Sequence, residues 1–361
     1  MKAAVMREVG KPLTIEEVQI DKPKGREVLI RTSAVGVCHS DLHFLDGSYP
    51  YSLPTVLGHE AAGIVEAVGA EVRTVKQGDT VITCISAFCG YCEHCLTGHM
   101  SLCANPETQR TEDEPARIAS STGGMEQFLN LSSFAEQMLI HEHACVAFNS
   151  EGIGMDRAAL LGCAVITGVG VIMHTAQVRV GETVVVIGCG GIGLSAINGA
   201  AIAGAVRIIA VDRVASKLDM ARTFGATDVV NANEVDAVES VLDLTNGGVH
   251  HAFEAIGSKE TAEQAFAMLA RGGTATIIGM IPVGVKIEIE GRAFLGEKRL
   301  QGSLMGSNHF PVDMPRLVEF YLQGRLKLDE LISKRLKLDD INDAVDELRR
   351  GELARSVIMF E

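Results

Sequence analysis

The chain has 361 residues, which is long for a single core and favours two domains. Its 46 Asp and Glu residues against 32 Lys and Arg give a net charge of −14, which argues against nucleic acid or an anionic membrane as a partner. The first residues hold no long apolar core and no cleavage-site pattern, so we expect no secretory signal and a cytoplasmic protein. In that compartment, nine cysteines indicate metal binding or catalysis before disulfides.

The first 150 residues read as a β-rich domain, because short apolar segments such as 27–31 and 62–69 alternate with Gly, Pro and Asp turns. Two stretches in it carry reactive side chains: Cys-His-Ser-Asp-Leu-His at 38–43 and Gly-His-Glu at 58–60. A further cysteine, Cys163, stands near the end of this part. A lone cysteine is most often a small buried residue, and spacing alone does not assemble these segments. From this pattern alone, the cysteines and histidines of these segments could either bind one shared metal ion or have separate structural roles.

A cysteine cluster with the spacing C-x2-C-x2-C-x7-C lies between residues 89 and 103. Four thiolates so close in sequence, interrupted by glycines, can surround one tetrahedral ion, for which Zn²⁺ is the usual choice. Such a site leaves no position for substrate and is predicted to be structural. The polar segment that follows, 104–124, is expected to be a long surface loop. The predicted ligands are Cys89, Cys92, Cys95 and Cys103.

From about Ala164 the pattern changes to alternating strands and helices, which is typical of a doubly wound parallel sheet. The apolar run 158–173 contains three glycines and a threonine and is predicted to fall short of a membrane span. The predicted strands are 184–188, 206–211, 228–231, 251–256 and 274–279, with helices such as 217–224 and 259–269 between them.

After about residue 305 the pattern is less regular. Helices are predicted at 314–323 and 341–350, and a strand at 355–360. A sheet already completed near residue 304 has no place for this last strand. We therefore expect the tail to return to the first domain.

The first strand of the alternating part runs into a Gly-x-Gly-x-x-Gly turn that opens a helix. Gly188 would make the tight turn, Gly190 would let the backbone approach a pyrophosphate, and Gly193 would let helix and strand pack closely. The positive end of the helix dipole then faces the phosphates of a dinucleotide. Gly191 and Ile192 complete the predicted cradle.

The second strand ends in Asp212, about twenty residues further on, where a carboxylate would bind the adenosine ribose hydroxyls. The 2′-phosphate of NADP would stand about 4 Å from this carboxylate, at a cost of roughly 4 kcal/mol per charge pair. Arg213, the next residue, could tolerate a phosphate but leaves the repulsion in place. NAD is therefore favoured.

Together these motifs make the chain resemble the zinc-dependent medium-chain alcohol dehydrogenases, from the N-terminus to Glu361. The pattern Gly58-His59-Glu60-x2-Gly63-x5-Gly69, the four-cysteine cluster, Cys163 and the dinucleotide turn occur in the family's order. The resemblance implies an α/β protein with a β-rich GroES-like catalytic domain and a doubly wound parallel-sheet (Rossmann) cofactor domain. The catalytic domain would comprise residues 1–164 and 305–361, and the cofactor domain residues 165–304.

The resemblance assigns roles that spacing alone leaves open. It implies that Cys38, His59 and Cys163 bind a catalytic zinc, so with the structural site we expect two Zn²⁺ ions per chain. Asp41 would fix the tautomer of His59, and Glu60 would lie beside the metal as an outer carboxylate.

Other family positions concern the proton, the cofactor and the substrate. Ser40 is expected to contact the substrate alcohol, and His43 to pass its proton to solvent. His39 and Arg355 would face the pyrophosphate of NAD, and Lys217 would lie near the adenosine ribose. The residues expected to line an apolar pocket are Tyr49, Ile85, Phe134 and Leu304.

The expected activity is zinc- and NAD-dependent oxidation of a primary aliphatic or aromatic alcohol to an aldehyde, and the reverse reduction. The glutathione-dependent formaldehyde dehydrogenase branch has an arginine where this chain has Glu107, which would repel an anionic glutathione adduct. One alternative is a formaldehyde dehydrogenase or dismutase of the same fold. Another is a non-catalytic NAD-binding protein, although such a protein would be expected to lose Cys38, Ser40 or His59. The edge-strand segment 298–305 indicates a homo-oligomer, a dimer or a tetramer.

Overall fold

The structure is a computed structural model that describes residues 1–111, 113–351 and 354–360. Glu361, to which the family resemblance extends, lies outside the described residues. The chain divides into two units. Unit 1 contains residues 1–164, 309–324 and 328–361, and unit 2 contains residues 165–308 and 325–327.

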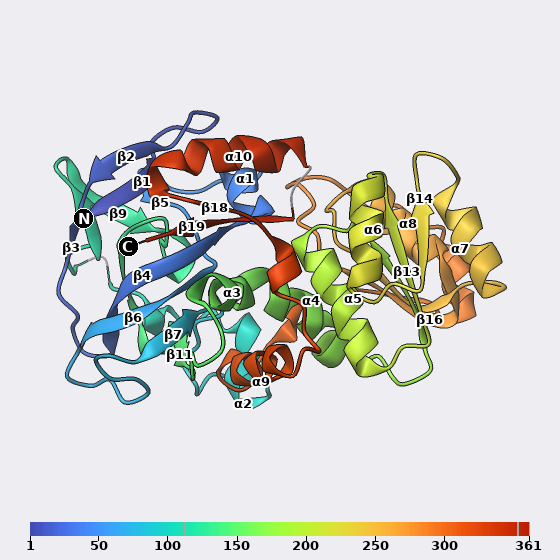
Figure 1. Cartoon of the computed structure of the whole chain (residues 1–361), viewed down its shortest axis with the longest axis horizontal. Coiled ribbons are helices and arrows are strands. Elements are labelled where there is room, and N and C mark those ends of the chain that lie inside the picture. Colours follow the sequence, from blue (N-terminus) through green and yellow to red (C-terminus); the bar gives the residue numbers. More distant parts are fainter. Residues whose placement is uncertain (112, 352–353, 361) are drawn as a thin grey trace. The chain divides into compact units, whose positions relative to one another are not determined.

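Unit 1 is built on two sheets. One has the strand order β2-β1-β5-β9-β8-β3, and the other has the order β11-β7-β6-β4-β19-β18, with β10 also paired to β4. The long strand β4 runs through the second sheet between β6 and β19 (Figure 1). The strands are β1 (Lys2–Met6), β2 (Thr14–Glu17), β3 (Gln19–Ile20), β4 (Glu27–Val37), β5 (Thr55–Val56), β6 (Ala61–Val68), β7 (Thr80–Thr83), β8 (Ile118–Ser120), β9 (Gly123–Gln127), β10 (Gln137–His141), β11 (Cys145–Ala147), β18 (Ile332–Leu336) and β19 (Arg355–Met359).

The helices of unit 1 are short except for the two near the C-terminus. In α10 the residues Ile341, Ala344, Val345 and Leu348 are buried, a spacing that places them on one face of a helix. That face explains the contacts of α10 with β19 and α1. The α-helices are α1 (His39–Leu45), α2 (Glu93–Leu96), α3 (Met155–Leu160), α9 (Phe310–Leu322) and α10 (Ile341–Arg350), and the short helical turns include η2 (Pro106–Thr108) and η5 (Leu161–Val165).

The last strand joins the sheet of unit 1, as its sequence predicted. β19 pairs antiparallel with β4, from Ser356 opposite Val37 to Met359 opposite Ala34, and parallel with β18. The start of β19 therefore lies beside the end of β4, where Cys38 follows.

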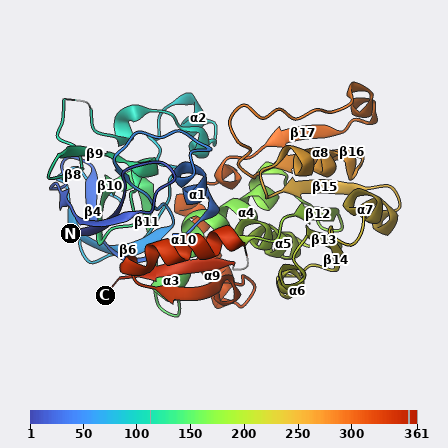
Figure 2. The same cartoon turned by 90° about the horizontal axis from the view of Figure 1, so that it is seen from above.

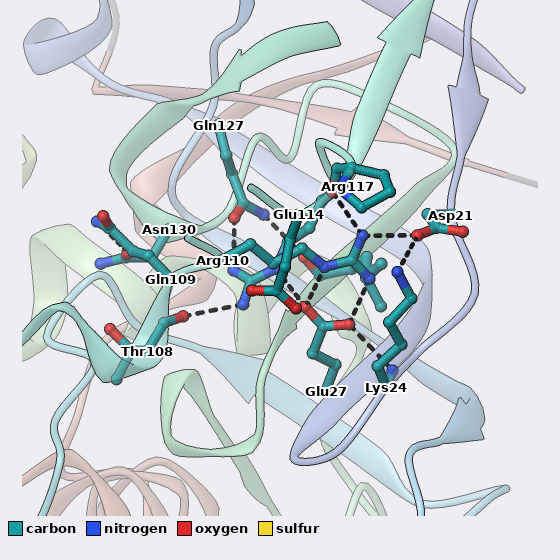
Figure 3. Close-up of polar contacts among 12 residues, drawn as sticks. Asp21, Lys24, Glu27, Thr108, Gln109, Arg110, Glu114, Arg117, Gln127 and Asn130 are labelled. Carbon is teal, nitrogen blue, oxygen red and sulfur yellow. Dashed lines mark hydrogen bonds and ion pairs between the residues drawn. The ribbon is translucent and has the colours of Figure 1, made fainter. Parts of the chain in front are cut away.

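The segment 104–124 is the predicted surface loop only in its first part, since most of its described residues up to 116 are exposed and outside any strand. The later part differs. It contains β8, which pairs with β3 and β9, and both Arg117 and Ile118 are buried. Glu27 at the start of β4 accepts two bonds from Arg110, of 2.8 and 2.6 Å, and one of 2.7 Å from Arg117 (Figure 3). The loop prediction missed this part because these charges pair with one another and are withdrawn from solvent.

Unit 2 contains one parallel sheet with the order β14-β13-β12-β15-β16-β17, the order of a doubly wound dinucleotide-binding fold. The strand labels follow this order in Figure 2. Each strand predicted from the sequence is present within a few residues of its expected bounds, and β17 forms one edge. The strands are β12 (Thr183–Ile187), β13 (Arg207–Asp212), β14 (Asp228–Asn231), β15 (Val249–Glu254), β16 (Leu269–Ile277) and β17 (Arg299–Gly302).

Helices cover the strands of unit 2. α5 and α6 contact β13, while α7 and α8 contact β15 and each other. Val185 and Ile209 of the central strands share a buried core with Val241 of α7 and Phe266 of α8. The helices are α4 (Ile166–Gly170), α5 (Gly191–Ala203), α6 (Ala215–Thr223), α7 (Ala237–Thr245) and α8 (Lys259–Ala267), and the helical turns include η6 (Val171–Thr175), η7 (Gly291–Gly296) and η8 (Met305–Ser307).

The apolar run 158–173 belongs to a helical stretch, Met155–Thr175, that is longer than the sequence pattern predicted. Among the described residues it is the one helix long and apolar enough to cross a membrane by length and composition. However, 83% of its most apolar window is buried inside the protein, and the core helix of a soluble protein passes the same test. The run is therefore weak evidence for a membrane span.

Candidate active site

Three residues from distant parts of unit 1 meet in its interior. Cys38 follows β4 and precedes α1, His59 lies just before β6, and Cys163 belongs to the π-helical turn η5. All three are buried, and their ligand atoms lie within 4.8 Å of one another. Two thiols and an imidazole in this arrangement can hold Zn²⁺ and leave one position for a substrate oxygen. The donor set therefore fits the catalytic zinc predicted for these residues.

The carboxylate of Asp41 joins the segments that carry two of these ligands. It accepts hydrogen bonds from the backbone N–H groups of Cys38 (3.1 Å) and Gly58 (3.2 Å), and it lies 3.0 Å from Nδ1 of His59. Because an ionised carboxylate can only accept, Nδ1 of His59 carries the proton. Nε2 is then the nitrogen with a free lone pair for a metal.

Glu60 and Arg355 form a buried ion pair beside this cluster. The backbone N–H of Ala164 donates to Oε1 of Glu60 at 3.0 Å, and Nε of Arg355 lies 3.3 Å from Oε2. Burial raises the pKa of Glu60 to about 7, although the charge of Arg355 opposes this effect. The role of Glu60 as an outer carboxylate of the metal site stays a prediction.

Arg355 also reaches the first ligand, since its Nη2 lies 3.5 Å from Sγ of Cys38. A hydrogen bond with Cys163, aided by the charges of Arg355 and His59, holds the pKa of the Cys38 thiol well below its usual value despite burial. The sequence analysis did not predict this contact. It assigned Arg355, from the family resemblance, to the pyrophosphate of NAD. That cofactor role stays a prediction.

The first turn of α1 carries the residues predicted for proton transfer. Oγ of Ser40 lies 3.7 Å from Sγ of Cys38, and His43 follows three residues later on the same side of the helix. His43 is half-buried; burial lowers its pKa, while the charges of Cys38 and Asp46 oppose the shift. Its ring centroid lies 5.9 Å from that of Tyr49. His39, at the start of this turn, is exposed.

The four-cysteine cluster is assembled around the short helix α2. Sγ–Sγ distances are 3.9 Å for Cys89–Cys95, 3.5 Å for Cys92–Cys95 and 3.8 Å for Cys92–Cys103. A tetrahedron with Zn–S bonds of about 2.3 Å has edges of about 3.8 Å, so these sulfurs fit one ion. Burial raises the pKa of the Cys89 thiol, but hydrogen bonds from the backbone N–H groups of Tyr91 and Cys92 outweigh this effect and lower the pKa to about 7. All four positions of this site would be protein ligands.

The residues predicted to line the pocket differ in their surroundings. In unit 1, Ile85 is half-buried after β7, whereas Phe134 is fully buried and its N–H donates to the carbonyl of Leu57. In unit 2, Leu304 precedes η8 and is 54% exposed. The pocket role of these residues stays a prediction.

An aromatic residue that the sequence analysis missed packs against the histidine of the candidate zinc site. The ring centroid of Phe128 lies 6.1 Å from that of His59, 4.9 Å from that of Phe44 and 5.1 Å from that of Tyr51. No motif marks Phe128, because an aromatic side chain at the end of a strand fits any core.

The glycine turn of unit 2 has room for a ligand. Gly188 has φ +95°, a conformation that favours glycine, and a Cβ on Gly193 would overlap the carbonyl oxygen of Gly188. A Cβ on Gly190, in contrast, would meet no protein atom within 4 Å. Gly191 and Ile192 begin α5, whose first N–H groups point toward the turn. The cradle therefore fits a pyrophosphate.

Asp212 ends β13 beside this turn. Its carboxylate accepts bonds from the backbone N–H groups of Cys189 (2.7 Å) and Val214 (3.0 Å), so it is held at the rim of the cradle. Arg213 is exposed, and its guanidinium lies 3.8 Å from the carboxylate of Glu260. Lys217, one turn into α6, is half-buried.

A second residue missed by the sequence analysis is the buried Glu254 at the carboxyl end of β15. Its Oε1 accepts bonds of 2.8 Å from the N–H groups of Ile256 and Gly257 and from the hydroxyl of Thr261. The turn held in this way lies against the cradle, since a Cβ on Gly188 would stand 2.6 Å from the Ile256 side chain. Only the three-dimensional structure reveals this support.

Comparisons with known proteins agree with this geometry. Residues 24–150 match the family model of the alcohol dehydrogenase GroES-like domain, and residues 191–323 match that of the zinc-binding dehydrogenases. The chain is 38% identical to an NDMA-dependent alcohol dehydrogenase of Amycolatopsis methanolica, over 99% of this chain and 98% of that protein. It is also 38% identical to an S-(hydroxymethyl)glutathione dehydrogenase of Escherichia coli, over 99% of both chains.

Solved structures resemble the whole chain. An alcohol dehydrogenase zinc-binding domain protein from Burkholderia ambifaria is 35% identical with a TM-score of 0.94, over 100% of this chain and 98% of that one. The benzyl alcohol dehydrogenase of Acinetobacter calcoaceticus is 32% identical, also with a TM-score of 0.94, over 100% and 99% of the two chains. With both family models matched and near-complete coverage, this protein belongs to the zinc-dependent medium-chain alcohol dehydrogenase family.

Proposed function

We propose that this protein oxidises a primary alcohol to an aldehyde with NAD, and catalyses the reverse reduction. The observation that carries the proposal is the buried cluster of Cys38, His59 and Cys163, whose ligand atoms lie within 4.8 Å of one another. Ser40 and His43 stand on the adjacent helix turn. Two relatives named for alcohol substrates, the NDMA-dependent and the benzyl alcohol dehydrogenase, support the same reaction class.

Bound at these sites, Zn²⁺ would supply a Lewis acid for the substrate oxygen and NAD a hydride acceptor. The protein's own groups handle the proton. As the Ser40 hydroxyl accepts the proton from the substrate hydroxyl, it releases its own proton toward His43, which passes it on to solvent. Burial lowers the pKa of His43, so its imidazole is neutral near pH 7 and able to accept. Meanwhile Asp41 holds Nδ1 of His59 and so orients Nε2 as the nitrogen that would bind the metal.

Glu107 favours a simple alcohol over a glutathione adduct. Its side chain is hydrogen-bonded to the hydroxyl of Tyr91, and its carboxylate lies 3.8 Å from Arg26. Nε of Arg26 also forms an ion pair with the carboxylate of Glu142, at 2.7 Å, so Arg26 is not free to bind another anion. A carboxylate in this place opposes the negative charge of an adduct.

The wild-type protein is expected to reduce NAD with primary aliphatic or aromatic alcohols. The test compares kcat/KM over a panel of such alcohols with that for formaldehyde plus glutathione, with and without NDMA as acceptor. Because Glu107 repels an anionic adduct, we expect the best alcohol to exceed the adduct by about tenfold or more, equivalent to ~1.4 kcal/mol. Turnover of the adduct alone would refute the alcohol assignment.

We infer two zinc ions per chain with unequal roles. Metal analysis of the wild type should find about two, and Cys163→Ala should lose one while the protein stays folded. Cys92→Ala should instead lower thermal stability, because a metal held entirely by protein ligands contributes its binding energy to folding. A fully active wild type with a single zinc per chain would contradict the assignment.

We infer that Asp212 selects NAD over NADP. Its carboxylate would accept hydrogen bonds from the ribose hydroxyls, and even with screening ~2 kcal/mol of repulsion toward a 2′-phosphate should remain. Asp212→Gly should therefore lower the ratio of kcat/KM for NAD over NADP at least about tenfold, mainly through weaker NAD binding. A wild type that already prefers NADP, or an unchanged ratio in the variant, would exclude this role.

We also infer a homo-oligomer formed at the edge of the unit 2 sheet. β17 is the last strand of that sheet, and exposed apolar side chains lie near it, including Phe294, Leu295 and Leu304. An open edge of this kind favours pairing with a two-fold mate. Light scattering should give the mass of a dimer or a tetramer, and a monomer mass at working concentration would rule the proposal out.

A further inference from the structure

The segment that follows β9 has an unusual backbone. Leu129, Asn130 and Ser132 have φ values of +47°, +65° and +56°, in the left-handed region that residues other than glycine seldom adopt. Such conformations cost about 1 kcal/mol or more each and persist where neighbouring contacts impose them. The segment 128–132 is therefore held in place by its surroundings.

The contacts that hold it also join it to the zinc-site histidine. The hydroxyl of Tyr51 donates to the Gln127 carbonyl at 2.9 Å and accepts from the Leu129 N–H at 3.2 Å. Just beyond the segment, the Ser133 N–H donates to the carbonyl of Gly58 at 3.0 Å. The backbone of this segment is thus fixed directly beside His59.

Asn130 uses its side chain to connect this segment with two others. Its Nδ2 donates to the carbonyl of Ile85 at 3.4 Å, and its Oδ1 accepts from Nε2 of Gln109 at 3.1 Å. Glycine would adopt the same backbone at lower cost but could make neither bond. The two side-chain hydrogen bonds therefore explain why asparagine, and not glycine, occupies this position.

The far end of this connection is rigid. Arg110, next to Gln109, donates to Glu27 and to Asp21, the latter at 2.6 Å (Figure 3). Arg117 donates to Glu27 at 2.7 Å, to the carbonyl of Thr108 at 2.9 Å and to Gln127 at 2.7 Å. The buried ion pairs thus fix Gln109 on one side and the start of the strained segment on the other.

We propose that Asn130 is a positioning residue for substrate specificity, because it holds the Ile85 wall of the substrate pocket. This inference rests on the proposed function and on the pocket role that the family resemblance implies for Ile85. The wall depends on a polar connection from Glu27 through Arg110, Gln109 and Asn130. Loss of the connection lets Ile85 move and broadens the range of alcohols accepted.

Two variants at Asn130 remove the connection without straining the backbone. Asn130→Gly suits φ +65° and loses both bonds, while Asn130→Asp tolerates the same backbone but cannot donate to Ile85. The matched control is Asn246→Gly, the same exchange at a left-handed asparagine (φ +53°) that ends α7 in unit 2.

Two measurements follow on each protein. Amide hydrogen exchange in peptides covering residues 84–88 should rise in both Asn130 variants and not in the control. The ratio of kcat/KM between the best and the poorest alcohol of the panel should fall about two- to tenfold, the range expected for one hydrogen bond, through KM more than kcat. Zinc content and Tm should stay at wild-type values.

The outcomes separate this inference from the proposed function. Unchanged exchange at residues 84–88, or a substrate ratio like that of Asn246→Gly, would overturn the role of Asn130 even in an active alcohol dehydrogenase. If the wild type oxidises no alcohol, the proposed function fails and with it the specificity role. The exchange measurement then still decides whether Asn130 holds Ile85.

Discussion

One carboxylate, that of Asp41, ties together the two segments that carry Cys38 and His59 of the candidate metal site. It bonds the backbone on either side of the cluster, at Cys38 and at Gly58, and it orients the ring of His59. A buried carboxylate is costly unless its oxygens are hydrogen-bonded, and these three bonds meet that cost. The two ligand-bearing segments therefore share one anchor, and neither can shift without disturbing the other. The turn of α1 that carries Ser40 and His43 is fixed by the same bonds.

The remaining buried charges follow from this arrangement. Cys38 has a lowered pKa and Glu60 carries a carboxyl group in an interior site, so a cation must stand nearby. Arg355 supplies it, and burial leaves this guanidinium 2% exposed. Its position between a ligand sulfur and an outer carboxylate suits a site whose charge changes when a metal binds or leaves. The fold provides Arg355 from β19, at the other end of the chain.

What the sequence could predict depended on whether a signal was local. The strands of unit 2 are continuous apolar runs such as Val184–Ile187, and the turn at Gly188 and the four-cysteine spacing each lie within a few residues. Cys38, His59 and Cys163 are far apart, so only the family resemblance brought them together. Pairings set by topology gave no signal at all. Arg117 with Glu27, Arg355 with Cys38 and Asn130 with Ile85 join segments whose proximity no pattern encodes.

The discontinuous course of unit 1 affects how the chain is made. Residues 1–164 leave the ribosome long before β19, and unit 2 is synthesised between them. Until β19 arrives, the last four residues of β4, Ala34 to Val37, have an open edge directly before Cys38. Unit 1, which holds the candidate zinc sites, is thus the last to be completed, although β1 is made early. Removal of β19 would take away the strand that joins β18 to β4, and with it one side of the sheet.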